Sequence, residues 1–285
     1  MNTLLLIGGD LGMRTAALLD HDHWEVIGLR RRPMRYNSYD DILWYQANLW
    51  DWRSLSFLGR DEFSEVTHIL YAPAPAGRTH RDYAEIYSFG LGRVLYSLPR
   101  NFRDRLQRCV LVGSSAVWGP SDEWVNEDTP VQRIGFRAES LLDAETALGA
   151  LLAPGIGTTL RLSGLYGPDR MRLIDGLVND TITAPEGPGH WANRLHIDDA
   201  ARACAHLLTL ADPDPLYIGT DDHPMPTADL YDAVAELAGT DRPTRQPRPP
   251  SGKRLSNARL RAGGWTPEWP DALAGYAACL AESGR

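Results

Sequence analysis

The sequence has few cysteines and no long apolar segment. Its three cysteines in 285 residues, Cys109, Cys204 and Cys279, are far apart and odd in number, so neither a disulfide framework nor a zinc site is expected. No apolar run approaches the roughly 18 residues that a membrane helix needs. The N-terminus also lacks the basic region and cleavage site of a signal peptide. We therefore expect a cytoplasmic protein with reduced thiols and no membrane partner.

The sequence also lacks an excess of positive charge. Lys and Arg together number 29 and Asp and Glu number 37, which gives a formal net charge of −8. This balance argues against nucleic acid as a partner. We expect a small-molecule substrate as the partner, and a homodimer stays open.

Short apolar runs alternate with helical patterns in the first half of the chain. The runs predict strands over 3–7, 24–29, 45–49, 66–72, 109–114 and 158–163, and helices over 11–19, over 82–98 and from about 136. Continuous apolar strands that alternate with helices are typical of a parallel sheet covered on both faces. The predicted fold class is α/β, a Rossmann-type doubly wound parallel sheet.

Glycine and proline become frequent after residue 165, as in "LYGPDR" and "TAPEGPGHWANR". Helices are predicted over 199–210, 228–238 and from about 270, with a short strand over 216–218. We therefore predict an NAD(P)-binding Rossmann domain over 1–165 and a smaller C-terminal substrate-binding lobe over 166–285, with 193–220 returning to the Rossmann core.

The stretch "LLLIGGDLGMRTAALL", from residue 4, has the pattern of a strand, a glycine-rich turn and a helix. A dinucleotide site uses this arrangement because glycine lets the backbone approach the pyrophosphate at a helix N-terminus. Gly9 and Gly12 fit the second and third glycines of G-x-G-x-x-G, whereas Ile7 occupies the first position. A tight turn without a ligand is the alternative. The predicted cofactor contacts are Gly8, Gly9, Asp10, Leu11 and Gly12.

Three arginines follow the second predicted strand in "IGLRRRP". An acidic residue at this spacing holds the ribose of NAD, whereas an arginine accommodates the 2′-phosphate of NADP. Arg30, Arg31 and Arg32 stand there with no carboxylate among them, although a solvated basic loop would show the same letters. The sequence therefore predicts NADP, with NAD as the less favoured cofactor.

Five further segments lie in a characteristic order along the chain: "ANLWD" (47–51), "YAPAP" (71–75), "VGSSAVWG" (112–119), "LRLSGLYGP" (160–168) and "NRLHIDDAARA" (193–203). Together they resemble the extended short-chain dehydrogenase/reductase superfamily, also called the NAD-dependent epimerase/dehydratase family, over nearly the whole chain. The resemblance implies that Asn48, which replaces an Asp, and Leu49 lie near the adenine. It implies that the backbone at Tyr71 and Ala72 passes the nicotinamide-side ribose.

The same resemblance identifies a departure from the family's catalytic pattern. Its enzymes use a Ser or Thr in the "SSxxVYG" segment and a Y-x-x-x-K motif on the next helix. Here Ser114 matches the serine, whereas Arg137 and Leu141 stand at the tyrosine and lysine positions, and no Tyr or Lys occurs in 132–152. Arginine stays protonated in proteins and leucine has no donor. The chain therefore resembles an atypical subgroup that lacks the YxxxK motif.

Three functions remain open at this point. The first is a reductase for a small carbonyl or imine, in which Ser114 binds the substrate, Tyr166 or Tyr71 gives a proton, and Arg137 holds an anionic group. The alternatives without a catalytic role are that Tyr166 packs in a loop, that Ser114 caps the end of a strand, and that Arg137 is an exposed residue at the helix N-terminus. The second is a nucleotide-sugar epimerase or dehydratase, and the third is a non-catalytic NADP(H) sensor or scaffold.

His196 with Asp198 and Asp199 has the residue types of a metal site or a catalytic triad. Aspartate is also a preferred helix N-cap. We therefore expect Asp198 or Asp199 to cap the helix that follows, His196 to pack locally, and no metal to bind.

Overall fold

The computed structural model describes residues 1–32 and 42–284, which form two compact units. Unit 1 comprises Met1–Val117, Gln132–Arg161 and Ala201–Tyr217, and unit 2 comprises Trp118–Val131, Leu162–Ala200 and Ile218–Arg285. The segment Trp118–Val131, from the first half of the sequence, thus belongs to the same unit as the C-terminal residues. None of the described helices is long and apolar enough to cross a membrane.

A seven-stranded sheet forms the centre of unit 1, with the strand order β12-β7-β5-β4-β1-β2-β3. Its strands are β1 (Asn2–Gly8), β2 (Trp24–Arg30), β3 (Ile42–Gln46), β4 (His68–Ala72), β5 (Arg108–Ser114), β7 (Gly157–Leu162) and β12 (Leu216–Gly219). The neighbours from β3 to β5 pair in parallel. This is the doubly wound order of the Rossmann fold, so the predicted fold class is confirmed.

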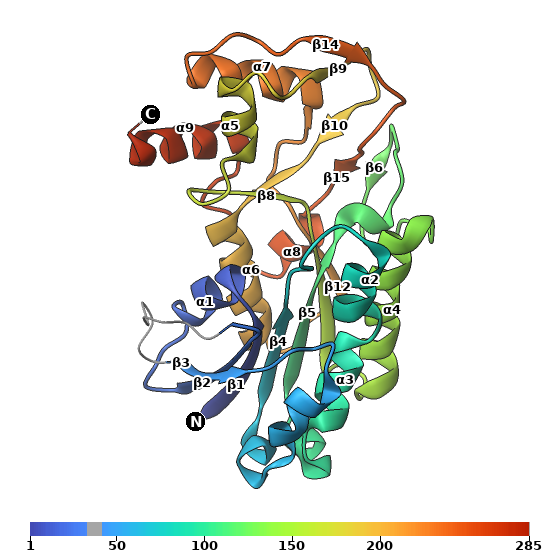
Figure 1. Cartoon of the computed structure of the whole chain (residues 1–285), viewed down its shortest axis with the longest axis vertical. Coiled ribbons are helices and arrows are strands. Elements are labelled where there is room, and N and C mark those ends of the chain that lie inside the picture. Colours follow the sequence, from blue (N-terminus) through green and yellow to red (C-terminus); the bar gives the residue numbers. More distant parts are fainter. Residues whose placement is uncertain (33–41, 285) are drawn as a thin grey trace. The chain divides into compact units, whose positions relative to one another are not determined.

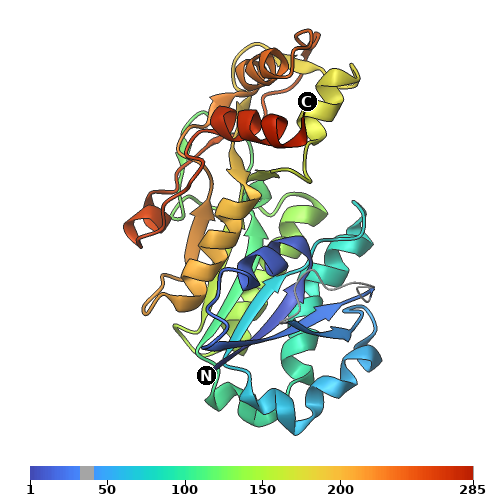
Figure 2. The ribbon, with the colours of Figure 1, turned by 90° about the vertical axis from the view of Figure 1, so that its left-hand side faces the viewer.

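Helices cover both faces of this sheet (Figure 1). On one face lie α2 (His80–Tyr83), α3 (Gly90–Ser97) and α4 (Gly135–Leu151), and α1 (Asp10–Ala16) packs against β1 and β4 on the other. Figure 2 shows α1 in front of the strands. Because both faces are covered, the central strands are buried except at their ends, which explains their uninterrupted apolar runs.

Short helical turns connect these elements. They are η1 (Trp52–Gly59), η2 (Asp61–Glu65), the π-helical η3 (Ala84–Ser88), η4 (Arg100–Asp104) and η5 (Ser115–Val117). The π-helical turn interrupts what the sequence predicted as one helix over 82–98. The third strand likewise begins earlier than predicted and ends at Gln46, because Asn48 opens a turn in which its Oδ1 accepts from the N–H of Trp50 at 3.1 Å.

Unit 2 is built around α5 (Arg172–Val178), α7 (Thr227–Leu237), α9 (Ala272–Ser283) and the parallel pair β8 (Gly164–Tyr166) and β11 (Arg194–His196). Its core contains Tyr166, Ile174, Leu230, Val234 and Tyr276. The other pairs are β9 (Ala184–Glu186) with β14 (Arg245–Pro247), β10 (Trp191–Ala192) with β13 (Met225–Pro226), and β6 (Trp124–Val125) with β15 (Arg254–Leu255), and α8 spans Ala258–Ala262.

The helix α6 (Ile197–Thr209) begins at the segment that contains the two neighbouring aspartates. The carboxylate of Asp199 is fully buried and accepts hydrogen bonds from the backbone N–H groups of Glu268 and Trp269, at 2.7 and 2.9 Å. Asp199 therefore anchors the segment before α9 within unit 2. The predicted helix cap is wrong, because α6 begins at Ile197 and both Asp198 and Asp199 lie within its first turn.

Candidate functional site

A cavity of about 490 Å³ opens at the carboxyl ends of β1, β2 and β4 in unit 1. We call it the arginine cavity. Its described lining residues are Ile7, Gly8, Gly9, Leu29, Arg30, Arg31, Arg32, Ala47, Leu49, Pro73, Ala74, Ala76 and Ile86. The volume lies within the range of small-molecule sites. Its position, where the order reverses between β1 and β4, is where open α/β sheets bind ligands.

The turn after β1 forms one wall of the cavity because two glycines remove side chains from it. Gly8 has φ +148°, and a Cβ there would lie 2.6 Å from the carbonyl oxygen of Ala72 on β4. A Cβ on Gly9 would meet nothing within 4 Å, so its backbone faces open space. A Cβ on Gly12 would overlap the side chain of Leu6, so Gly12 lets α1 rest directly on β1.

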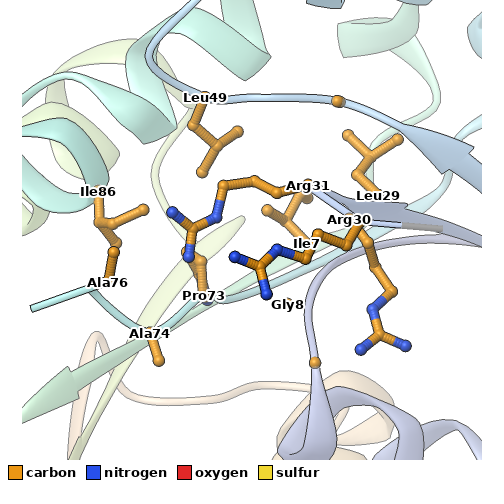
Figure 3. A pocket seen from close by; sticks show the side chains of 13 residues that line it. Ile7, Gly8, Leu29, Arg30, Arg31, Leu49, Pro73, Ala74, Ala76 and Ile86 are labelled. Atoms are coloured by element: carbon orange, nitrogen blue, oxygen red, sulfur yellow. The ribbon is translucent and has the colours of Figure 1, made fainter. Parts of the chain in front are cut away.

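The arginines at the end of β2 form the opposite wall. Arg30 is half-buried, with its guanidinium 5.2 Å from the Trp44 ring and its Nη1 3.8 Å from the sulfur of Met13. Arg31 and Arg32 are exposed. Figure 3 shows the Arg31 side chain extended across the cavity, between Leu49 and Pro73. The cavity therefore concentrates positive charge on one side.

Acidic groups are sparse around these arginines. The described lining residues include no Asp or Glu. One acidic group that interacts with them is Asp82 in α2, whose pKa is lowered by hydrogen bonds from Thr79 and, less strongly, by the charges of Arg81 and Arg31. The side chain of Asp10 is already paired with Arg14 at 2.8 Å. The electrostatic preference of the cavity is therefore for an anion.

The cavity brings together five residues predicted as cofactor contacts, namely Gly8, Gly9, Arg30, Arg31 and Leu49. The other predicted contacts are not among its lining residues; they are Asp10, Leu11, Gly12, Asn48, Tyr71 and Ala72. Sequence reasoning missed Ile7, Leu29, Ala47, Pro73, Ala74, Ala76 and Ile86. Most of these lie at or just beyond the carboxyl end of a predicted strand, which is the signal that could have found them.

Tyr71 cannot serve as the proton donor that the sequence suggested. It is fully buried within β4, and its hydroxyl donates a 2.5 Å hydrogen bond to the backbone carbonyl of Ile86. Burial, with smaller contributions from Tyr87 and Cys109, raises the pKa of this phenol well above its usual value. Tyr71 is therefore a structural residue that holds the π-helical turn η3.

Tyr166 is likewise unsuited to proton donation. It is 1% exposed in unit 2, where its ring stacks on Tyr276 with centroids 4.3 Å apart and meets His196 edge-on at 5.2 Å. Burial first, and then the charge of Asp221, raises the pKa of its hydroxyl above the usual value. The packing alternative therefore describes Tyr166 better than the catalytic one.

The helix α4 carries the two replaced catalytic positions. Arg137 is exposed and stacks on Tyr83 and Phe136, with its guanidinium 5.8 and 5.7 Å from their ring centroids. Leu141 is 2% exposed and part of the core. These environments suit a surface cation and an apolar core residue. Neither offers an acid or base with a tunable pKa.

Ser114 lies at the carboxyl end of β5, the neighbour of β4 in the sheet. It is half-buried, and its Oγ accepts a 3.2 Å hydrogen bond from the backbone N–H of Ala116. Because an accepting hydroxyl keeps its own proton, Ser114 can still donate to a ligand. Among the described residues, no group of three or more His, Cys, Asp or Glu side chains could hold a metal ion.

Comparison with known proteins adds an independent observation. No protein-family model and no curated protein matches the chain. Among solved structures, a protein from Methylobacillus flagellatus assigned to the NAD-dependent epimerases/dehydratases is 30% identical, with a TM-score of 0.79, over 100% of this chain and 99% of that one. The chain belongs to the NAD-dependent epimerase/dehydratase family. It is thus a member of the extended short-chain dehydrogenase/reductase superfamily.

Solved structures with lower sequence identity share the fold alone. The UDP-glucose 4-epimerase of Thermus thermophilus, solved in complex with NAD, is 21% identical over 96% of both chains, with a TM-score of 0.76. A human epimerase family protein, solved with NADPH, is 16% identical over 97% of this chain and 98% of that one, also with a TM-score of 0.76. Proteins with this fold therefore include ones solved with either nicotinamide dinucleotide.

Proposed function

We propose that this epimerase/dehydratase family member binds NADP(H) in the arginine cavity. The observation that carries the proposal is the meeting of three arginines with the Gly8–Gly9 turn at one cavity that has no described acidic lining residue. A turn of this kind accepts a pyrophosphate, and arginine at the end of the second strand accommodates a 2′-phosphate. An acidic residue, which NAD sites use at this place, is absent from the described lining.

The chemistry of the lining fits each part of the dinucleotide. Gly9 offers backbone with open space beside it, which suits a pyrophosphate that must approach closely. Leu29, Ala47 and Leu49 offer an apolar surface to the adenine. Arg30 and Arg31 both line the cavity, Arg30 half-buried and Arg31 exposed, so they are available to a phosphate, which a guanidinium binds through two parallel hydrogen bonds.

We propose reduction of a small carbonyl or imine as the activity. Bound NADPH supplies a hydride, and the protein supplies position and polarity. In this proposal Ser114 hydrogen-bonds the substrate oxygen or nitrogen, and the end of β5 at the same edge of the sheet as the cavity supports that role. With Tyr71 and Tyr166 buried, the proton that completes the reduction comes from solvent through this hydroxyl.

Equilibrium titration with NADPH and NADH, followed by cofactor fluorescence, tests the binding proposal. We expect NADPH to bind at least about tenfold more tightly than NADH, because one charge-assisted contact is worth more than about 1.4 kcal/mol. Equal affinities for NADPH and NADH would show that the arginines do not bind a 2′-phosphate. The absence of binding by either cofactor would overturn the proposal as a whole.

A non-catalytic NADP(H) sensor is the second candidate. The burial of Leu141 and the exposure of Arg137 favour it, because these residues replace the family's acid/base pair. The loss of that pair also weighs against a nucleotide-sugar epimerase or dehydratase, which needs the same tyrosine. Incubation with NADPH and a panel of aldehydes, ketones and imines separates the two candidates. Turnover that falls in a Ser114→Ala variant supports the reductase, and tight binding without turnover supports the sensor.

A further inference from the structure

Unit 2 contains a cluster of polar side chains beside the strand pair β8–β11. It comprises Tyr166 on β8, Arg194 on β11 and Asp221, which follows β12. The backbone N–H of Asp221 donates to the carbonyl of Arg194 at 2.8 Å, and the amide of Asn257 donates to the carbonyl of Asp221 at 3.3 Å. The main chain at Asp221 is thus held by two hydrogen bonds, one at its N–H and one at its carbonyl.

Several side-chain atoms of this cluster have no hydrogen-bond partner among the residues that the structure describes. Asp221 is 1% exposed and neither of its carboxyl oxygens has a hydrogen-bond partner among the described residues. The same holds for the Tyr166 hydroxyl and for Nε of Arg194. Leaving a buried polar group without a hydrogen-bond partner costs stability, because the group loses its bonds to water and gains none in the protein. A cluster of such groups in one place therefore indicates that a ligand pairs with them.

Arg194 gives the cluster a positive charge. It is half-buried and takes part in no ion pair with a described residue. Its guanidinium lies over Gly164 of β8, where a Cβ would stand 2.6 Å from Nη1. The missing side chain of Gly164 therefore makes the space in which this guanidinium lies. A partly buried cation without a counter-ion is stabilised by an anion.

The acidic groups around Asp221 determine its charge. The charges of Asp271 at the start of α9 and of the neighbouring Asp222 raise the pKa of Asp221, and the charge of Arg194 opposes them. Asp222 is already paired with Arg261 at 3.2 Å. Burial first, and then the charge of Asp271, raises the pKa of Asp221 to about 8. At neutral pH the group is therefore mainly the neutral acid, which can donate a hydrogen bond.

We propose that Arg194 and Asp221 form a binding site for an oxyanion group, either a carboxylate or a phosphate, of a small molecule. The guanidinium supplies the charge and two parallel donors, and the carboxylic acid of Asp221 supplies a further donor without repelling the anion. The Tyr166 hydroxyl completes the set. Because all these residues belong to unit 2, the site is independent of the arginine cavity and of its proposed cofactor.

Acetate and methylphosphonate serve as probes for the two kinds of oxyanion, since broadening of their methyl NMR signals reports binding to the whole protein. We expect binding by wild-type protein and about a tenfold loss of affinity in Arg194→Gln. Arg172→Gln, which removes an exposed arginine of the same unit, is the matched control and should bind as wild type. An Arg30→Ala/Arg31→Ala variant should also retain binding, which separates this site from the arginine cavity. The stronger of the two probes identifies the kind of oxyanion.

The pH dependence provides a test that does not depend on Arg194→Gln folding. Acetate keeps its charge from about pH 6 to about pH 10, so a change in its affinity reports the protein. Affinity in the wild type should fall as pH rises through about 8, and Asp221→Asn should bind at all these pH values without the fall. The proposal would be overturned if wild type and Arg194→Gln bound the probes with equal affinity, or if Arg172→Gln lost as much affinity as Arg194→Gln. It would also be overturned if the affinity of Asp221→Asn fell with rising pH as that of the wild type does.

Discussion

The hydroxyl of Tyr71 donates a 2.5 Å hydrogen bond to the backbone carbonyl of Ile86, across from β4 to the π-helical turn η3. Gly90 makes this approach possible, because a Cβ there would overlap the tyrosine oxygen. Ile86 in turn lines the arginine cavity. The side chain that the sequence suggested as a proton donor is thus a support for one wall of the candidate cofactor site.

Replacement of Tyr71 by Phe should lower the free energy of unfolding by about 1–3 kcal/mol, because the buried carbonyl of Ile86 loses its donor. Denaturant unfolding measures the effect. Tyr45→Phe is the control, since the Tyr45 hydroxyl bonds Glu62 on the surface at 3.1 Å and its loss should cost little. Equal and small effects in both variants would contradict the structural role of Tyr71.

Two neighbouring glycines should respond differently to the same substitution. Gly8→Ala places a methyl group 2.6 Å from the Ala72 carbonyl oxygen at a φ of +148°, so it should destabilise the fold by about 1–3 kcal/mol. Gly9→Ala meets no atom within 4 Å, but Gly9 has φ −120° and ψ −117°, which alanine does not readily adopt. It should therefore destabilise the fold less than Gly8→Ala, while it narrows the cavity and weakens NADPH binding. Thermal unfolding and cofactor titration together check this pair, and the reverse pattern would refute the turn geometry.

A buried ion pair joins α4 to β7. Glu145 accepts two hydrogen bonds from Arg161, at 2.9 and 2.6 Å, and the two side chains are 16% and 5% exposed. Glu145→Gln should cost about 3–5 kcal/mol, because it leaves the buried guanidinium without its counter-charge. Glu65→Gln, which breaks the exposed pair with Arg105, should cost less than about 1 kcal/mol. Denaturant unfolding measures both variants, and similar losses of unfolding free energy in Glu145→Gln and Glu65→Gln would contradict the prediction.

His68 should make the protein less stable in acid. It is 5% exposed, its Nδ1 lies 2.8 Å from the Thr67 hydroxyl, and burial first, then Arg108, lowers its pKa to about 4. Because this is below the value near 6.5 of the unfolded chain, its contribution is fully present above about pH 6.5 and is lost as pH falls through about 4. Denaturant unfolding at several pH values measures this.

The matched variants are His68→Phe and His223→Gln. His68→Phe removes the titrating group while keeping a ring against Trp24, whose centroid lies 4.5 Å away, so its stability should change less between about pH 6.5 and about pH 4. His223 is exposed, and its replacement should leave the wild-type pH dependence in place. A His68→Phe variant with the wild-type slope would contradict the prediction.

The sequence predicts the sheet well because its strands are buried on both faces, as the uninterrupted run Leu4–Ile7 illustrates. It does not predict the break at Ala84–Ser88. That break depends on Tyr71, which is distant in sequence and close only in the folded chain. The predicted proton donors are wrong for the same reason. A tyrosine hydroxyl can donate a proton, but the burial of Tyr71 and Tyr166, which prevents it, is known only from the fold.

The candidate site is predictable in part for a similar reason. Gly8, Gly9 and the arginines from Arg30 belong to local motifs with fixed spacing, so their meeting follows from the strand order. Ala76 lies in the loop after β4 and Ile86 in the π-helical turn η3, and neither segment has a motif that predicts its place in the cavity. Arg194 and Asp221 are separated by 26 residues, and their proximity follows from a backbone hydrogen bond that no spacing rule predicts.

The affinities of NADPH and NADH for wild type and for Arg30→Ala/Arg31→Ala test the central claim most directly. If these arginines hold the 2′-phosphate, the double substitution should weaken NADPH binding by about tenfold or more and leave NADH binding almost unchanged. The two cofactors should then bind the variant alike. An equal loss for both cofactors, or NADPH binding that does not change, would contradict the account.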